Sequence, residues 1–421
     1  MILDHVHLER RFMRKLRMLT AGALVLVMLT GCSFFAGSQA QMEAAPNVTG
    51  DTVTVSKEEY DRLQKYKELD ELLQVVQEYY YQEPDIDKLV ENAERGLLFG
   101  LEDPYSFYYS PEEYAKLWEE DEGKYAGIGI QISANFDTLV CTVSRVFKGS
   151  PAQAAGLHKG DVLKQVNDLA VDAYNLQDAV DIMRGAVGET VEVTVRRGTE
   201  NLTLTVARAE IHVNRVESVM LDGNIGVISL FEFAGDCRTA FTEAVDRLVN
   251  DGAKGLIIDL RDNPGGWVDD AVAIADIFLP EVTVYYTENR KGEREYAASK
   301  AGQLGLPLVV MMNENSASAS EVLAGALQDH GVASVVGVTS YGKGIIQYVL
   351  PVGSKGAGMQ LTVAQYFTPN GNKVHKVGIT PNVEAKLPEG DNGMYEIGDL
   401  KDPQLAKAVE TLKGKMAPTG N

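Results

Sequence analysis

The chain is poor in positive charge, cysteine and histidine. Its 39 lysine and arginine residues are outnumbered by 60 aspartate and glutamate residues, which gives a net charge of −21. This excess argues against nucleic acid as a partner, because phosphate binding needs a basic face. The 3 cysteines and 6 histidines are scattered, without a Cys-x-x-Cys pair or a Cys/His cluster. The sequence therefore predicts no metal site and no cofactor.

The N-terminus lacks an apolar run long enough to span a bilayer comfortably. The run from Met18 to Thr30 is short, follows a basic segment, and ends in Leu29-Thr30-Gly31-Cys32, which looks like a bacterial lipobox. We expect residues 1–31 to be a lipoprotein signal peptide and Cys32 to be lipidated after cleavage, which would hold the protein on the outer face of a bacterial membrane. An uncleaved signal anchor is the alternative.

The two remaining cysteines fall in different predicted domains. Outside the cytoplasm Cys141 and Cys237 could pair. Because they are separated in this way, we expect two free, buried thiols.

The length of 421 residues allows two or three domains, and 45% hydrophobic residues fit a folded globular protein. Residues 32–55 lack periodicity and predict a flexible tether. Residues 56–122 predict a helical region, with helices over 57–83 and 86–100 and a third beginning at Ser110-Pro111. Residues 391–421 predict a C-terminal helix and tail.

Residues 211–390 alternate short apolar runs with helical segments. The runs 224–230, 255–260 and 306–312 are rich in branched residues, as buried strands are. Helical spacing between the first two runs gives a β-α-β pattern, so we expect the α/β class.

The most informative stretch runs from Asn313 to Gln347. It places a serine-rich turn at the start of a predicted helix, and then Lys343 between two glycines, with Gln347 four residues later. A lysine can remove the proton from a serine if burial lowers its pKa. On chemistry alone Ser316, Ser318 and Ser320 are all candidates, since each could also cap the turn.

This stretch resembles the catalytic core of the C-terminal processing, or tail-specific, proteases, which are Ser-Lys endopeptidases with an embedded PDZ domain. In that family the nucleophile lies 25 residues before the lysine and a glutamine lies four after it. The resemblance implies Ser318 as nucleophile, Lys343 as general base and Gln347 as the residue that orients the lysine. It also implies a crotonase/ClpP-like β-α superhelical core with an inserted PDZ domain.

An oxyanion hole is expected beside Ser318. Its donors would be the backbone N–H of Ala319 and that of Gly265 or Gly266 in the loop Asn263-Pro264-Gly265-Gly266. The same loop departs from the family by carrying Trp267 where an aliphatic residue is usual. We interpret Glu321 as a first-turn carboxylate that complements the helix dipole.

Residues 123–210 resemble a PDZ domain. A glycine-containing loop before a strand can hold a free carboxylate, and the strand edge can pair with an extended peptide. Arg184 could couple peptide binding to the protease core, or be an ordinary surface arginine. The alternative for the whole domain is that it packs on the core and binds no peptide. The predicted groove residues are Tyr125, Ala126, Gly127, Ile128, Gly129, Ile130, Leu176, Val180 and Met183.

The sequence therefore predicts an extracytoplasmic serine endopeptidase that cuts proteins with apolar C-terminal tails near their C-terminus, with the PDZ domain gating the site. The resemblance also implies that the N-terminal helices either dock on the core or form a homodimer. A non-catalytic PDZ scaffold is a second reading, disfavoured by the intact Ser318, Lys343 and Gln347. A crotonase-type acyl-CoA enzyme is a third, disfavoured by the predicted export and the PDZ domain.

Overall fold

The computed structural model describes residues 54–416, apart from 137, 301, 392 and 394. The predicted signal peptide, Cys32 and nearly all of the predicted tether lie outside these residues. Among the helices of the described part, none is both long enough and apolar enough to cross a bilayer.

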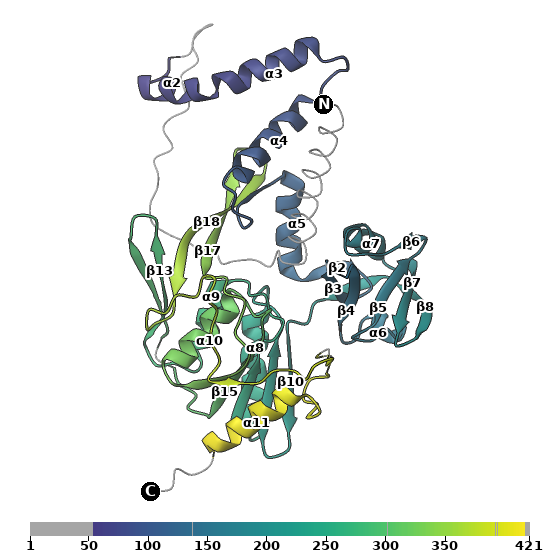
Figure 1. Ribbon diagram of the computed structural model, residues 1–421, viewed down its shortest axis with the longest axis vertical. Coiled ribbons are helices and arrows are strands. Elements are labelled where there is room, and N and C mark those ends of the chain that lie inside the picture. The colour runs from purple at the N-terminus through teal and green to yellow at the C-terminus, as the bar shows by residue number, and fades with distance from the viewer. Residues whose placement is uncertain (1–53, 137, 301, 392, 394, 417–421) are drawn as a thin grey trace.

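A six-stranded sheet forms the centre of the main body (Figure 1). All neighbours from β11 onward are parallel, and β10 pairs antiparallel with β11 at one edge. The strands, in spatial order, are β10 (Val216–Leu221), β11 (Ile225–Leu230), β12 (Gly255–Asp259), β15 (Leu308–Met312), β16 (Ala333–Gly337) and β19 (Val383–Glu384).

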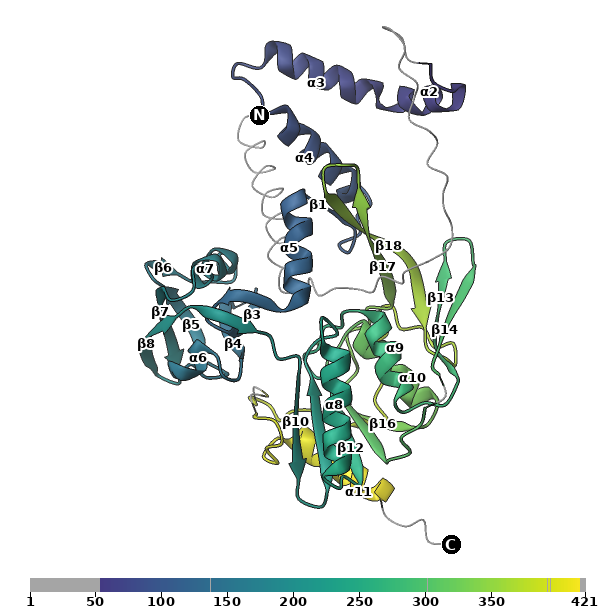
Figure 2. The same ribbon diagram turned by 180° about the vertical axis from the view of Figure 1, so that it is seen from behind.

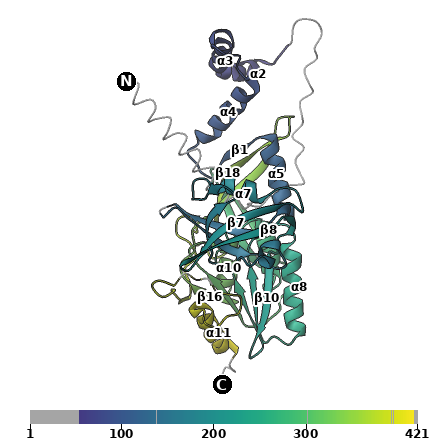
Figure 3. The same cartoon turned by 90° about the vertical axis from the view of Figure 1, so that its right-hand side faces the viewer.

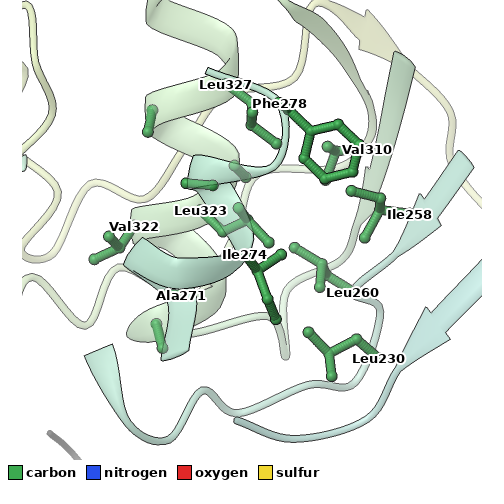
Figure 4. Packing of buried hydrophobic residues seen from close by; sticks show 14 of the residues in the cluster. Leu230, Ile258, Leu260, Ala271, Ile274, Phe278, Val310, Val322, Leu323 and Leu327 are labelled. Atoms are coloured by element: carbon green, nitrogen blue, oxygen red, sulfur yellow. The ribbon is translucent and has the colours of Figure 1, made fainter. Parts of the chain in front are cut away.

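Helices cover both faces of this sheet, which explains the continuous apolar runs in its sequence. Alternate side chains such as Ile258 and Val310 pack under three helices, and Figure 4 shows them facing Ile274 and Leu323. The strand residues between them, such as Ile257, point to the opposite face and pack on a fourth helix. Figure 2 shows the molecule from the reverse side. The helices are α8 (Cys237–Asn250), α9 (Val268–Asp276) and α10 (Ala319–Asp329) on the first face, and α11 (Pro403–Met416) on the second.

A second, antiparallel sheet stands beside the first and carries the segment after Lys343. Its long hairpin joins β17 (Ile345–Val352) to β18 (Ala357–Phe367), and β13 (Thr283–Asn289) with β14 (Arg294–Ala298) extends it. Strand β1 (Phe107–Tyr109), from the N-terminal region, also pairs with β18. The N-terminal region is therefore built into the sheet that holds the predicted base.

Residues 124–212 form a smaller body with its own apolar core. Strands β2 (Lys124–Gly127) and β9 (Ala209–His212) pair where the chain enters and leaves it. Cys141 lies in this core and Cys237 in the larger one, and both are buried and free. The remaining elements are β3 (Ile130–Asn135), β4 (Val140–Val146), α6 (Pro151–Ala154), β5 (Val162–Val166), β6 (Leu169–Ala170), α7 (Leu176–Met183), β7 (Thr190–Arg197) and β8 (Glu200–Ala207).

The N-terminal helices extend away from the main body (Figure 3). The helix expected over 57–83 is interrupted by a 3₁₀ turn at Gln64–Tyr66 and ends at Tyr79, a few residues before Pro84, which disfavours helical backbone in the residue preceding it. Neither of its two parts has a buried residue. The helices are α2 (Lys57–Leu63), α3 (Lys67–Tyr79), α4 (Ile86–Phe99) and α5 (Pro111–Glu122).

Candidate active site

Ser318 occupies a strained turn between β15 and α10. Its φ of 57° and ψ of −117° lie where residues with side chains are rarely found, at a cost on the order of 1–3 kcal/mol. The hydroxyls of Ser316 and Ser320 donate to the carbonyls of Leu260 (2.7 Å) and Asn263 (3.0 Å). The two flanking serines thus fasten the turn to the end of β12, whereas the Ser318 hydroxyl donates to no acceptor among the described residues.

The Glu321 carboxylate joins this turn to the lysine loop. Its Oε2 accepts hydrogen bonds from the backbone N–H groups of both Ser318 and Lys343, each at 2.9 Å. Its Oε1 accepts from the Gly342 N–H (2.7 Å) and from Ser340 Oγ (2.5 Å). Burial raises the pKa of this carboxyl, and the four hydrogen bonds oppose the rise. Glu321 does more than complement a helix dipole: it holds the two halves of the site together.

Lys343 is 5% exposed. A Cβ on Gly344 would lie 2.1 Å from the His375 nitrogen, so only glycine fits beside it. Burial lowers the pKa of Lys343 to about 8, although the negative charges of Glu321 and Asp103 act in the opposite direction. Its Nζ lies 4.8 Å from the centre of the Tyr105 ring. Asp103 and Tyr105 come from the turn before β1, and the sequence analysis did not identify them.

Gln347 is fully buried on β17, and its Nε2 donates to Thr362 Oγ1 at 3.2 Å. Its Oε1 has no hydrogen-bond partner within the described part of the chain. The hydrogen bonds of the described residues also include none between Ser318 Oγ and Lys343 Nζ.

The glycine loop after β12 lies directly against the Ser318 turn. A Cβ on Gly265 would lie 2.7 Å from Ser318 Cβ and 2.9 Å from the Ala319 nitrogen. The Gly265 N–H already donates to Asn263 Oδ1 at 2.8 Å. Within residues 54–416, as far as they are described, the N–H groups of Gly266 and Ala319 donate to no acceptor. These two are the groups that remain free to bind an oxyanion.

A cavity of about 250 Å³ lies beside strand β3 and helix α7, where the smaller body meets the main body. Of the predicted groove residues, all but Ala126 line it, and the Ala126 carbonyl accepts from the Gly185 N–H at 3.4 Å. Strand β3 pairs only with β4 among the described strands, which leaves an edge on which a peptide can add. Arg184 also lines the cavity, with its guanidinium 5.1 Å from the Tyr125 ring centre.

Arg145, which is not among the predicted site residues, joins the smaller body to the main body. From strand β4 its guanidinium donates to the Asn214 carbonyl (2.5 Å) and to Glu217 (2.9 Å), and it stacks on the Phe231 ring at 3.4 Å. Arg145 follows Cys141 and Val143 in the alternating buried positions of β4, and the sequence does not show which distant groups it meets there.

Comparison with known proteins agrees with this geometry. The model of peptidase family S41 matches residues 224–385, a PDZ domain model matches 142–197, and the model described as activating protease CtpB N-terminal domain matches 26–113. The fold and the matched domains define a serine peptidase with an embedded PDZ domain.

The chain is 36% identical to the carboxy-terminal processing protease CtpA of Bacillus subtilis, over 77% of this chain and 70% of that protein. It is 34% identical to the carboxy-terminal-processing protease of Bartonella bacilliformis, over 85% and 83%. Among solved structures, the photosystem II D1 C-terminal processing protease is similar with a TM-score of 0.55 and 28% identity, over 79% of this chain and 94% of that chain. The chain therefore belongs to peptidase family S41, among the carboxyl-terminal processing proteases, and the predicted family and fold class are confirmed.

The lowered pKa of Lys343 leads to a prediction of how the reaction rate depends on pH. A reaction in which its amine accepts a proton should accelerate as pH rises through about 8, because only the neutral amine is a base. The Asp103→Asn variant removes a charge that stabilises the ammonium, so the rise should move to lower pH. The measurement is kcat/KM for a tail peptide between about pH 6 and 10. The exposed Asp222→Asn variant is the control, and an unmoved or upward-shifted curve for Asp103→Asn contradicts this account.

Proposed function

We propose that the protein is an extracytoplasmic serine endopeptidase that uses a Ser-Lys mechanism to cut proteins near their C-terminus. One observation carries the proposal. A single carboxylate oxygen of Glu321 accepts hydrogen bonds from the backbones of Ser318 and Lys343, and so unites a strained serine and a buried lysine in one site.

The proposed chemistry assigns a role to each group of the site. Neutral Lys343 takes the Ser318 hydroxyl proton while Oγ attacks the scissile carbonyl carbon. The N–H groups of Gly266 and Ala319 stabilise the resulting oxyanion. The Lys343 ammonium then protonates the leaving amine. Lys343, which is neutral again, activates the water that hydrolyses the acyl-enzyme. Gln347 Oε1, buried without a partner, accepts from Lys343 Nζ and holds it in line.

Recognition of the tail is proposed for the cavity beside β3 and α7. An extended tail would add to the free edge of β3, and its carboxylate would meet the N–H groups of Ile128 and Gly129, which donate to no acceptor in the described part of the chain. Leu176, Val180 and Met183 supply an apolar surface on α7. This chemistry favours an uncharged, apolar C-terminal residue.

PDZ gating is supported by the position of the cavity. The cavity is lined from both bodies, since Val213, Arg215 and Phe231 join the groove residues in it. A bound tail would therefore touch the junction between the PDZ domain and the core.

Loss of cleavage in two variants tests the mechanism. Protein lacking residues 1–50 should release C-terminal fragments from apolar-tailed substrates, detected by mass spectrometry. Ser318→Ala and Lys343→Ala should each lower kcat by at least about 1,000-fold. The exposed Ser354→Ala and Lys254→Ala variants should cleave as the wild type does. Binding of tails without cleavage by the wild type would favour the scaffold reading instead.

Removal of the PDZ domain tests gating. A variant without residues 123–210 should cleave an untailed peptide faster than the wild type, because the restraint on the site is lost. Val180→Asp, which places a charge in the groove, should raise KM for tailed substrates and leave the rate on the untailed peptide unchanged. Unchanged or lost basal cleavage after the deletion would count against gating.

We propose that a homodimer forms through the N-terminal arm, the segment of helices α2 and α3 (residues 57–79). Its exposed apolar side chains include Leu72 at 62% and Tyr79 at 73% exposure, a contiguous set that a second copy could cover. Sedimentation of the protein with and without residues 1–84 distinguishes a dimer held by this arm from a monomer.

The proposed location on the outer face of a bacterial membrane rests on the lipobox-like Leu29-Thr30-Gly31-Cys32. Fractionation of cells that express the wild type or the Cys32→Ser variant tests it. Retention of both proteins in the membrane fraction would favour the uncleaved signal anchor.

A further inference from the structure

The two tryptophans of the chain lie against each other at the edge of the active site. Trp118 on α5 and Trp267 in the glycine loop stack with ring centres 5.8 Å apart and planes 7° from parallel. The Trp267 Nε1–H also donates to Asp121 Oδ1 at 2.7 Å. An aliphatic side chain at position 267 could form neither the stack nor the hydrogen bond.

Trp267 directly follows the two glycines of the loop, Gly265 and Gly266. Gly265 and Gly266 have φ values of 106° and 133°, which residues with side chains rarely adopt, and glycine alone does not fix such a conformation. The Trp267 N–H donates to the Phe233 carbonyl (2.7 Å), and the Phe233 N–H donates to the Gly265 carbonyl (2.8 Å). The direction of the Gly266 N–H therefore depends on where Trp267 and Phe233 are held.

Asp121 holds both of these segments. The same Oδ1 that accepts from Trp267 also accepts from the Gly235 N–H at 3.2 Å. Asp121 lies at the end of α5, immediately before the PDZ domain, and its carbonyl accepts from Arg215 on the returning linker at 2.9 Å. The two linkers are themselves joined by the Val213 N–H and the Gly123 carbonyl at 2.9 Å. The glycine loop is thus fastened to the base of the PDZ domain.

We propose that Trp267 and Asp121 are positioning residues for the oxyanion hole. The stack on Trp118 and the hydrogen bond to Asp121 hold the Gly266 N–H toward Ser318, so both residues act on the reaction through the loop and touch no reacting atom. This inference rests on the proposed Ser-Lys peptidase function and adds to it the residues that direct one oxyanion donor.

The test separates transition-state stabilisation from substrate binding. In Trp267→Leu and Asp121→Leu, kcat for a tailed peptide should fall by at least about tenfold while KM stays within about twofold, since the hole acts only as the oxyanion forms. A peptide aldehyde is the second probe: the Ser318 O–H adds across its C=O bond without a leaving group. Its affinity should fall by a factor similar to the fall in kcat/KM.

Two controls keep a structural effect apart from this one. Asp121→Asn retains an acceptor oxygen and should recover most of the wild-type kcat. Tyr296→Leu removes an exposed aromatic ring elsewhere and should change neither constant. Near-UV circular dichroism reports on the stack, because the chain has no other tryptophan. The Trp118→Leu variant removes the stacking partner without substituting a loop residue, and it should also lower kcat, because Trp267 is then held less firmly.

If Trp267→Leu and Asp121→Leu both keep the kcat and the aldehyde affinity of the wild type, the positioning role is overturned and the proposed peptidase function still stands. A rise in KM with unchanged kcat would also overturn it, since that result assigns the residues to substrate binding. A wild-type protein that neither turns over the peptide nor binds the aldehyde would instead refute the proposed peptidase function, and this inference with it.

Discussion

Glu321 places a carboxylate where water cannot solvate it, with the side chain fully buried at the first turn of α10. Such a group is tolerated only when its oxygens are hydrogen-bonded, and an unmet buried polar group costs about 1–3 kcal/mol. All four of its donors come from the Ser318 turn and the 340–343 loop. Closing that loop over the start of α10 satisfies the carboxylate and keeps Ser318 in its strained conformation at once.

The same constraint connects the two sheets of the main body. The parallel sheet supplies the turn before α10, and the antiparallel sheet continues from the lysine loop through β17. The turn before β1 completes the enclosure. The Gln360 amide donates to the Tyr105 carbonyl, and Ser106 Oγ accepts from the Thr362 N–H. The hydroxyl of the same Thr362 accepts from Gln347. Chain from the N-terminal region therefore shapes the surroundings of a lysine more than 200 residues later.

Features that depend on short stretches of the chain could be predicted from the sequence. Apolar runs such as 255–260 are read directly as strands buried on both faces, and the spacing between Ser318 and Lys343 follows from the resemblance. The roles of Asp103, Tyr105 and Glu321 were not accessible, because each depends on contacts between segments far apart in the chain. The same holds for Gly265, whose N–H is engaged by Asn263, a bond that the loop sequence does not reveal.

The ribbon formed by β2 and β9 brings the start and the end of the smaller body side by side. A module whose two ends lie together can be replaced, enlarged or lost as a unit, because the rest of the chain needs only that the ends still meet. With its own apolar core, this body is such a module. Within this architecture, the smaller body can diverge over evolution while the main body stays the same.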